Sequence, residues 1–152
     1  MRTLLGEFKA ITEGLNNAGI EYAVCGGWAM AIHGLPRATK DIDLLILFED
    51  LDRALNVARE HGFVVEGLPL NFDIEIRRIS KIDNENKQLI TLDLLLVSEK
   101  HREIWAGRQK IGWKEGETYV VSREGLINMK RLAGRTQDLA DIEKLSEVAD
   151  ES

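Results

Sequence analysis

The sequence predicts a mixed α/β (α+β) domain, in which a mixed β-sheet is flanked by helices and a short helical segment follows at the C-terminal end. In the first half, segments with apolar residues at helical spacing alternate with short apolar runs that are typical of strands. In the second half, two pairs of strand-like segments are each joined by a polar turn, which indicates β-hairpins. This irregular order of elements argues against a regular parallel-sheet repeat.

The individual elements follow from periodicity and from capping or turn residues. Helices are predicted over residues 3–18, 28–33, 49–61, 99–106 and 122–132, with a last helix from 136, and strands over residues 22–25, 41–48, 63–65, 72–82 and 88–97, with a second hairpin around 114–117. The strand from Asp41 continues as an uninterrupted apolar run, so it is expected in the centre of the sheet. In the last helix, Leu139, Ile142 and Leu145 are expected to face inward.

The length of the chain fits one domain. With 152 residues the chain can bury a hydrophobic core, and no repeat or low-complexity linker divides it. We therefore expect a single domain over residues 1–152, with a core over about 20–121 and C-terminal helices over about 122–149. A hydrophobic content of 44% and a charged content of 30% are ordinary for a soluble globular protein.

The charge and the apolar runs argue against several kinds of partner. The net charge of −6 disfavours binding to long nucleic acids, although Lys130, Arg131 and Arg135 leave room for a local basic patch and hence for tRNA. No apolar run approaches the roughly 20 residues that a membrane helix needs, so no membrane partner is expected. Glu7 and Lys9 interrupt the N-terminal apolar segment, which argues against a secretion signal and favours a cytoplasmic protein.

Two glycines and two carboxylates in the first third of the chain carry most of the functional signal. Gly26-Gly27 ends an apolar run ahead of a predicted short helix, where free backbone N–H groups suit a phosphate. In Asp41-Ile42-Asp43, the two-residue period of a strand puts both carboxylates on one face. Neighbouring carboxylates repel each other, and proteins often neutralise such pairs with a cation such as Mg²⁺. The spacing therefore indicates a site for a metal ion and a triphosphate.

A third carboxylate is expected from Asp93, the lone charge in the apolar run 89–97. Burying an unpaired carboxylate is costly, and a metal ion is one partner that would remove this cost. Nucleotidyl transfer commonly uses two metal ions about 3.5–4 Å apart, and two ions call for a third carboxylate on a strand next to the first pair. Asp73 and Glu75 are competitors, but their alternation with apolar residues fits a solvated face better.

With these residues together, the chain resembles the nucleotidyltransferase superfamily of the DNA polymerase β type. The Gly-Gly-Trp-Ala motif at 26–29 is similar to that of the lincosamide and aminoglycoside nucleotidyltransferases. The Arg-x-Thr-x-Asp-Ile-Asp pattern at 37–43 also resembles the AbiEii-like toxins, and the run 129–142 is similar to the C-terminal helical segment of small bacterial members. The resemblance covers about residues 20–145 and implies the nucleotidyltransferase fold.

The resemblance implies roles for three catalytic carboxylates. Asp41, Asp43 and Asp93 would bind two Mg²⁺ ions, for which Mn²⁺ is a substitute, with Asp93 nearest the acceptor hydroxyl as a candidate for its general base. The acceptor hydroxyl would attack the α-phosphorus of an NTP such as ATP and release pyrophosphate. The NTP is therefore the expected co-substrate.

Five further residues would bind the nucleotide. Gly26 and Gly27 would hold the β- and γ-phosphates, while Arg37 and Lys130 would neutralise phosphate charge. Thr39 belongs to the same motif and is assigned to the nucleotide site.

Other side chains near these motifs have plainer interpretations. Trp28 is expected to be a core or groove-wall residue. Asp138 and Asp141 are expected to be ion-pair or capping partners of Arg131 or Arg135.

Several alternatives stay open for the activity and the acceptor. A small molecule such as an antibiotic is the favoured acceptor, whereas a toxin-like version would modify tRNA or a protein. A different class of function is a nucleotide-binding module without catalysis. A second copy of the chain or an antitoxin is a further candidate partner.

Overall fold

The centre of the molecule is an eight-stranded mixed sheet, seen in a computed structural model that describes residues 3–35, 39–85, 87–113 and 116–151. The strand order is β3-β5-β6-β2-β1-β8-β7, and β4 pairs with β5 at one edge. The strands are β1 (Ala23–Cys25), β2 (Asp41–Ile46), β3 (Val65–Glu66), β4 (Leu70–Asn71), β5 (Glu75–Asp83), β6 (Gln88–Leu96), β7 (Gln109–Trp113) and β8 (Gly116–Val120). The mixed α/β class predicted from the sequence is confirmed.

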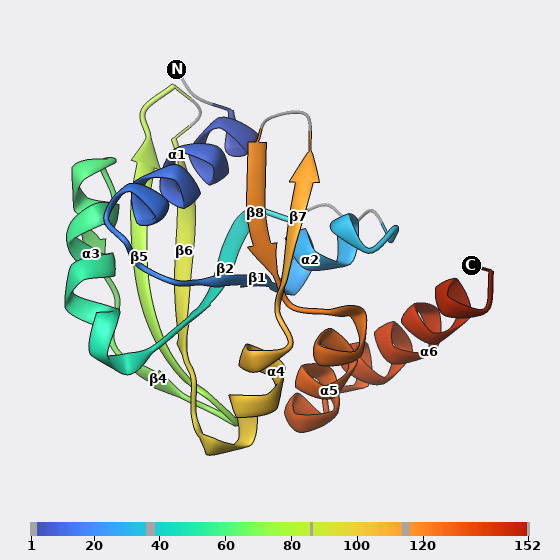
Figure 1. Cartoon of the computed structure of the whole chain (residues 1–152). Helices are drawn as coiled ribbons and strands as arrows, with labels where there is room; N and C mark the ends of the chain where they lie inside the picture. Colours follow the sequence, from blue (N-terminus) through green and yellow to red (C-terminus); the bar gives the residue numbers. More distant parts are fainter. Residues whose placement is uncertain (1–2, 36–38, 86, 114–115, 152) are drawn as a thin grey trace.

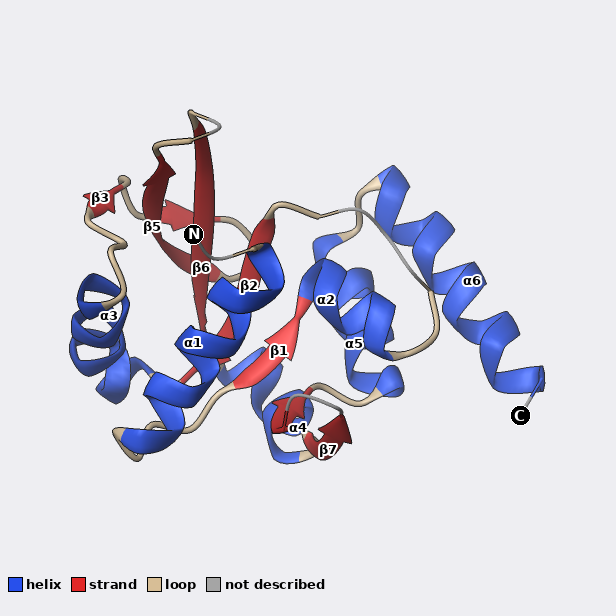
Figure 2. Cartoon of the chain, turned by 90° about the horizontal axis from the view of Figure 1, so that it is seen from above, coloured by secondary structure: helices blue, strands red, loops and turns tan. Residues whose placement is uncertain are grey.

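Helices cover the sheet and continue beyond it. They are α1 (Leu4–Asn17), α2 (Gly26–Ile32), α3 (Leu51–Glu60), α4 (Arg102–Ala106), α5 (Arg123–Ala133) and α6 (Thr136–Glu151), with 3-10 turns η1 (Phe48–Asp50) and η2 (Glu99–His101). Helices α1 and α3 pack against each other near β5 and β6, whereas α5 and α6 pack together at the other end of the sheet (Figure 1). In both views α6 projects away from the sheet (Figure 2). Across the described ranges, the model has no helix with the length and apolar character required to cross a membrane.

The N-terminal helix anchors the core that supports the site. The Thr3 side chain accepts a hydrogen bond from the Gly6 N–H and caps α1, whose inward face buries Phe8, Ile11 and Leu15. The ring of Phe8 stacks on that of Trp28, with centroids 4.4 Å apart and planes 13° from parallel. The expectation that Trp28 is a core or groove-wall residue is confirmed.

Strand β2 lies in the middle of the sheet, as its apolar run predicted. It pairs with β1 in antiparallel fashion and with β6 in parallel fashion, and β6 pairs in turn with β5 in antiparallel fashion. All of its apolar residues, Ile42, Leu44, Leu45 and Ile46, are fully buried, as in a central strand. The polar start of β2 is thereby held at a fixed place, at the edge of the core.

The structure differs from the expected elements in several places: β4 was not expected, β5 begins at Glu75 and not at Phe72, and two further differences concern α2 and α6. Helix α2 begins at Gly26, directly after β1, two residues earlier than predicted, so the two glycines form its first turn. In α6, Leu139 is 60% exposed and the prediction that it faces inward is wrong, whereas Leu145 is buried. The reason is that Asp138 and Asp141 are the buried residues of that first turn, where they bind basic side chains from α5 and from the loop before α6.

Candidate active site

Four polar residues on four neighbouring strands form one row across the sheet. Cys25 on β1 is the register partner of Asp43 on β2, Asp43 is the partner of Asp93 on β6, and Asp93 is the partner of Arg78 on β5. Residues in register on neighbouring strands point to the same face. Asp41, two residues before Asp43, lies on that face as well.

The row ends in a bidentate ion pair between Arg78 and Asp93. The Nε and Nη2 groups of Arg78 donate hydrogen bonds to the two carboxylate oxygens of Asp93, at 2.8 and 3.0 Å. Asp93 is 5% exposed, so this pair supplies the partner that a buried carboxylate needs. From the sequence, a metal ion was one expected partner of Asp93; the structure shows Arg78 in that position.

Burial and mutual repulsion disfavour the charged forms of Asp41 and Asp43, two carboxylates that line the cavity. Burial, and then the negative charges of Asp93 and Asp41, raise the pKa of Asp43 to about 7, with Arg78 opposing them. Burial, and then the charge of Asp93, also raises the pKa of Asp41. The pKa of the Cys25 thiol is well above its ordinary value because the thiol is buried beside Asp43 and Asp93. Cys25 is thus an inert wall residue, and the site favours a cation.

Gly26 and Gly27 are required by the packing of their neighbours. Gly26 has φ +64°, and a Cβ atom placed on it would lie 2.0 Å from Oδ2 of Asp43. A Cβ atom on Gly27 would lie 2.9 Å from Cβ of Thr39. The Thr39 hydroxyl in turn accepts a hydrogen bond from the Asp41 N–H at 3.2 Å. The two glycines let the first turn of α2 approach the start of β2.

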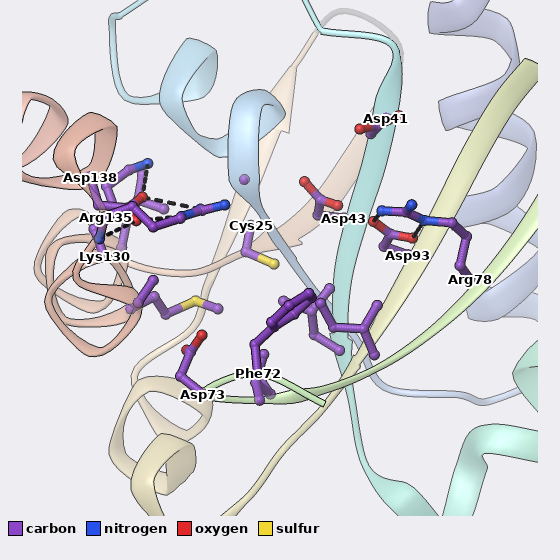
Figure 3. A pocket seen from close by; sticks show the side chains of 17 residues that line it. Cys25, Asp41, Asp43, Phe72, Asp73, Arg78, Asp93, Lys130, Arg135 and Asp138 are labelled. Atoms are coloured by element: carbon purple, nitrogen blue, oxygen red, sulfur yellow. Dashed lines mark hydrogen bonds and ion pairs between the residues drawn. The ribbon is translucent and has the colours of Figure 1, made fainter. Parts of the chain in front are cut away.

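A cavity of about 470 Å³ opens between this row and the C-terminal helices. One wall carries Asp41, Asp43, Asp93 and Arg78, as Figure 3 shows. The floor is apolar and comes from the β4–β6 region and from α5, with Phe72, Ile74, Ile76, Leu95, Leu126 and Met129 as its main residues. The cavity therefore combines a charged wall with an apolar surface of the kind that small-molecule sites present.

The opposite wall is built from ion pairs at the α5–α6 corner. The Lys130 ammonium donates to Asp141 at 2.9 Å and lies 3.8 Å from Asp138. Arg135 binds Asp138 through Nε at 2.7 Å and Nη2 at 3.2 Å, and its backbone N–H also donates to that carboxylate. Asp138 is therefore both an ion-pair and a capping partner of Arg135, as expected. Asp141 pairs with Lys130, not with either arginine.

The structure places the predicted site residues unevenly around the cavity. Asp41, Asp43, Asp93, Gly26 and Lys130 all line it. Gly27 and Thr39 lie behind this surface, packed against each other. Arg37 falls outside the residues that the structure describes.

Four cavity residues were not singled out as ligands by sequence reasoning. Arg78 and Phe72 belong to segments whose alternation merely indicated a strand, and Asp73 was assigned to a solvated face. Arg135, expected as part of a basic patch and as a partner of Asp138 or Asp141, points across the cavity toward the side of Asp43 (Figure 3). The signal that could have indicated Arg78 is the antiparallel register of β5 with β6, which places Arg78 opposite Asp93.

Asp41 and Asp43 suit a divalent cation because they offer carboxylate oxygens and because their pKa values are raised. Within the described ranges of the chain, no three His, Cys, Asp or Glu side chains are grouped so that they could hold one metal ion together. The three carboxylates share one wall, but Arg78 engages the third of them. The donor set thus fits a cation at Asp41 and Asp43.

Comparison with known proteins connects this geometry to antibiotic-modifying enzymes. The model of the aminoglycoside-2''-adenylyltransferase family matches residues 7–119 of the chain. The lincomycin-bound lincosamide antibiotic adenylyltransferase LnuA superposes with a TM-score of 0.61 at 14% identity, over 93% of this chain and 96% of that chain. ANT(2'')-Ia in complex with adenylyl-2''-tobramycin gives a TM-score of 0.57 at 14% identity, over 91% and 90% of the two chains.

A further solved structure is also similar to this chain. An antigenic nucleotidyltransferase-like protein from Paracoccidioides brasiliensis gives a TM-score of 0.58 at 20% identity, over 91% of this chain and 75% of that chain. No curated protein matches the sequence. At these identities the structural likenesses concern the fold, and they extend over nearly the whole chain.

Proposed function

Because the chain belongs to the aminoglycoside-2''-adenylyltransferase family, we propose that it transfers a nucleoside monophosphate from an NTP to a hydroxyl group of a small-molecule acceptor and releases pyrophosphate. ATP is the proposed donor, in line with the description of the family. The observation that carries the proposal is the register of Asp43 with Asp93, which brings carboxylates of two strands to one wall of a cavity.

Mg²⁺ is the proposed cofactor, and Asp41 and Asp43 are its proposed ligands. When bound, the ion would neutralise and orient the phosphates of the donor. Burial first, and then the charges of Asp93 and Asp41, raise the pKa of Asp43, and a bound cation would offset both effects as a proton does.

The donor phosphates are proposed to lie between the first turn of α2 and the α5–α6 corner. Gly26 lines the cavity beside Asp43 and offers backbone without a side chain, and Gly27 and Thr39 hold this turn in place. The guanidinium of Arg135, which Asp138 holds through Nε and Nη2, points into the cavity from the other side and brings positive charge there. Lys130 contributes there mainly by holding α5 and α6 together, since its ammonium is already bound to Asp141.

Asp93 is proposed to act on the acceptor. Its carboxylate oxygens each bind one N–H of Arg78, which leaves a second lone pair on each oxygen for an acceptor hydroxyl. In the proposed step the acceptor oxygen forms a bond to the α-phosphorus, the bond from that phosphorus to the pyrophosphate oxygen breaks, and the hydroxyl proton passes to Asp93. Asp43 and the turn at Gly26 keep the donor in line with this attack.

An antibiotic is the proposed acceptor, and the shape of the cavity supports a small molecule. The cavity volume is about 470 Å³, which suits a drug-sized ligand or its reacting part. The apolar floor formed by Ile74, Leu126 and Met129 provides contact area that a hydroxyl-bearing antibiotic would cover. The related LnuA and ANT(2'')-Ia structures hold lincomycin and adenylylated tobramycin, which makes these two compound classes the first to test.

The test is transfer of label from α-³²P-ATP with Mg²⁺ to lincomycin, to tobramycin, to tRNA and to the proteins of a cell extract. We expect a labelled antibiotic product with the natural chain, none with Asp43→Asn, and a normal yield with the exposed control Asp52→Asn. Label in tRNA or protein alone would favour a toxin-like activity. Nucleotide binding without any transfer would favour a binding module and contradict the proposal.

A further inference from the structure

We propose that Arg78 takes the place of a second metal ion at Asp93, so that the site binds one divalent cation and not two. The inference rests on the proposed function, since it concerns the cofactor of the same site. Its basis is the ion pair that closes the row Cys25, Asp43, Asp93, Arg78 on four adjacent strands.

The guanidinium of Arg78 occupies the position beside Asp93 where a second metal ion would have to bind. Two ions about 3.5–4 Å apart require Asp93 as a ligand in addition to the first pair of carboxylates. Both oxygens of Asp93 already accept hydrogen bonds from Arg78, at 2.8 and 3.0 Å. A dication bound to those oxygens would also lie beside the positively charged guanidinium, which repels it.

The backbone holds this pair together without help from a ligand. Arg78 and Asp93 are direct register partners in the longest strand pair described in the sheet, which runs from Glu75↔Leu96 to Asp83↔Gln88. A planar guanidinium matches a carboxylate in this two-pronged arrangement better than any other side chain, and it keeps its charge at all ordinary pH values. The pair is therefore a permanent part of the wall.

The charge of the wall matches a single divalent ion. Asp41, Asp43 and Asp93 bring three negative charges to the cavity, and Arg78 brings one positive charge. Two negative charges remain, centred on Asp41 and Asp43, and one divalent cation balances them. Arg78 thus acts as a positioning residue that holds the Asp93 carboxylate in place and free of metal.

The test counts ions and needs no turnover. The full chain is titrated with Mn²⁺ in the presence of the non-hydrolysable donor α,β-methylene-ATP, and free Mn²⁺ is measured by electron paramagnetic resonance. We expect one bound Mn²⁺ in the natural chain, one in Arg78→Lys, and two in Arg78→Met, where the third carboxylate is released. The neighbouring Arg77→Met is the matched control, because Arg77 pairs with Glu75 and does not line the cavity; it is expected to bind one.

The outcomes separate this inference from the proposed function. Two bound Mn²⁺ ions in the natural chain, or none, would overturn the inference even if nucleotide transfer is observed. A folded Arg78→Met that still binds one ion would overturn it as well. If Arg78→Met does not fold, the count for the natural chain decides alone. One bound ion without any transfer to an acceptor would leave the inference standing and contradict the proposed function.

Discussion

The backbone of Gly26 lies directly against the carboxylate of Asp43, so closely that a Cβ atom at this position would be 2.0 Å from Oδ2. The first turn of α2 and the start of β2 are therefore fitted to each other at the one place where the proposed donor phosphates and cation meet. The glycine is needed here for space as well as for its φ of +64°.

Replacing Gly26 by alanine is expected to abolish transfer. The methyl group would displace the Asp43 carboxylate, and we expect a loss of activity of about 100-fold or more, since small misplacements of reacting groups are costly. Gly19→Ala is the matched control, because Gly19 has a similar φ of +70° and open space around it. Labelled-nucleotide transfer and urea unfolding of both variants check this. Similar activity in the two variants would show that the contact with Asp43 is unimportant.

The stability of the metal-free protein is expected to fall as the pH rises from about 4 to about 7. The folded state holds the pKa of Asp43 near 7, whereas the unfolded value is about 3.9. Between these values the folded chain binds more protons than the unfolded chain, so the free energy of unfolding decreases with pH. Urea unfolding of the natural chain and of Asp43→Asn, in the presence of a chelator, measures this.

The comparison with Asp43→Asn isolates the effect of this one group. We expect the stability of the variant relative to the natural chain to grow by on the order of 2–4 kcal/mol between about pH 4 and pH 8. A difference that is the same at both pH values would mean that Asp43 is not perturbed in the folded chain.

Lys130→Met is expected to lower stability more than it lowers nucleotide affinity. The Lys130 ammonium pairs with the fully buried Asp141, and removing one partner of a buried pair typically costs about 3–5 kcal/mol. The double variant Lys130→Met with Asp141→Leu is expected to recover most of this stability. Unfolding curves and the KM for ATP of the single and double variants check the assignment. A double variant that is stable but has lost its affinity for ATP would restore Lys130 as a phosphate ligand.

Phe72→Ala is expected to weaken acceptor binding without affecting the fold. The Phe72 ring lines the cavity and is 70% exposed, so it contributes little to the core and offers its surface to a ligand. We expect KM for the acceptor to rise about 10-fold, as the loss of one aromatic contact suggests, with an unchanged unfolding midpoint. Phe48→Ala is the control, since Phe48 is 66% exposed and lies outside the cavity lining. Equal KM values for the two variants would assign the acceptor to another surface.

The fold and one wall of the site could be predicted from the sequence because their signals are local. The apolar run after Asp43 indicated a central strand, and the lone charge of Asp93 in an apolar strand indicated a polar face. The family match and the solved structures confirm the nucleotidyltransferase fold that these residues predicted. The register of β2 with β6 places Asp43 directly beside Asp93, as the proposed nucleotidyl transfer requires.

The remaining parts of the site depend on pairings between distant segments. Arg78 has no distinguishing neighbour in the sequence, and only the register of the β5–β6 hairpin shows that it binds Asp93. Likewise, Lys130 was expected to bind phosphate, but its actual partner comes from α6 across the helical corner. Leu139 was expected inside because helical periodicity does not reveal that buried carboxylates occupy the inner face of that turn.

Acceptor-dependent release of pyrophosphate from ATP tests the central claim most directly. The natural chain is incubated with Mg²⁺, ATP and lincomycin or tobramycin, beside Asp43→Asn, Asp93→Asn and the control Asp52→Asn. The account predicts release that requires an acceptor, persists in Asp52→Asn and is lost in the other two variants. Release that persists in Asp43→Asn and Asp93→Asn would contradict it.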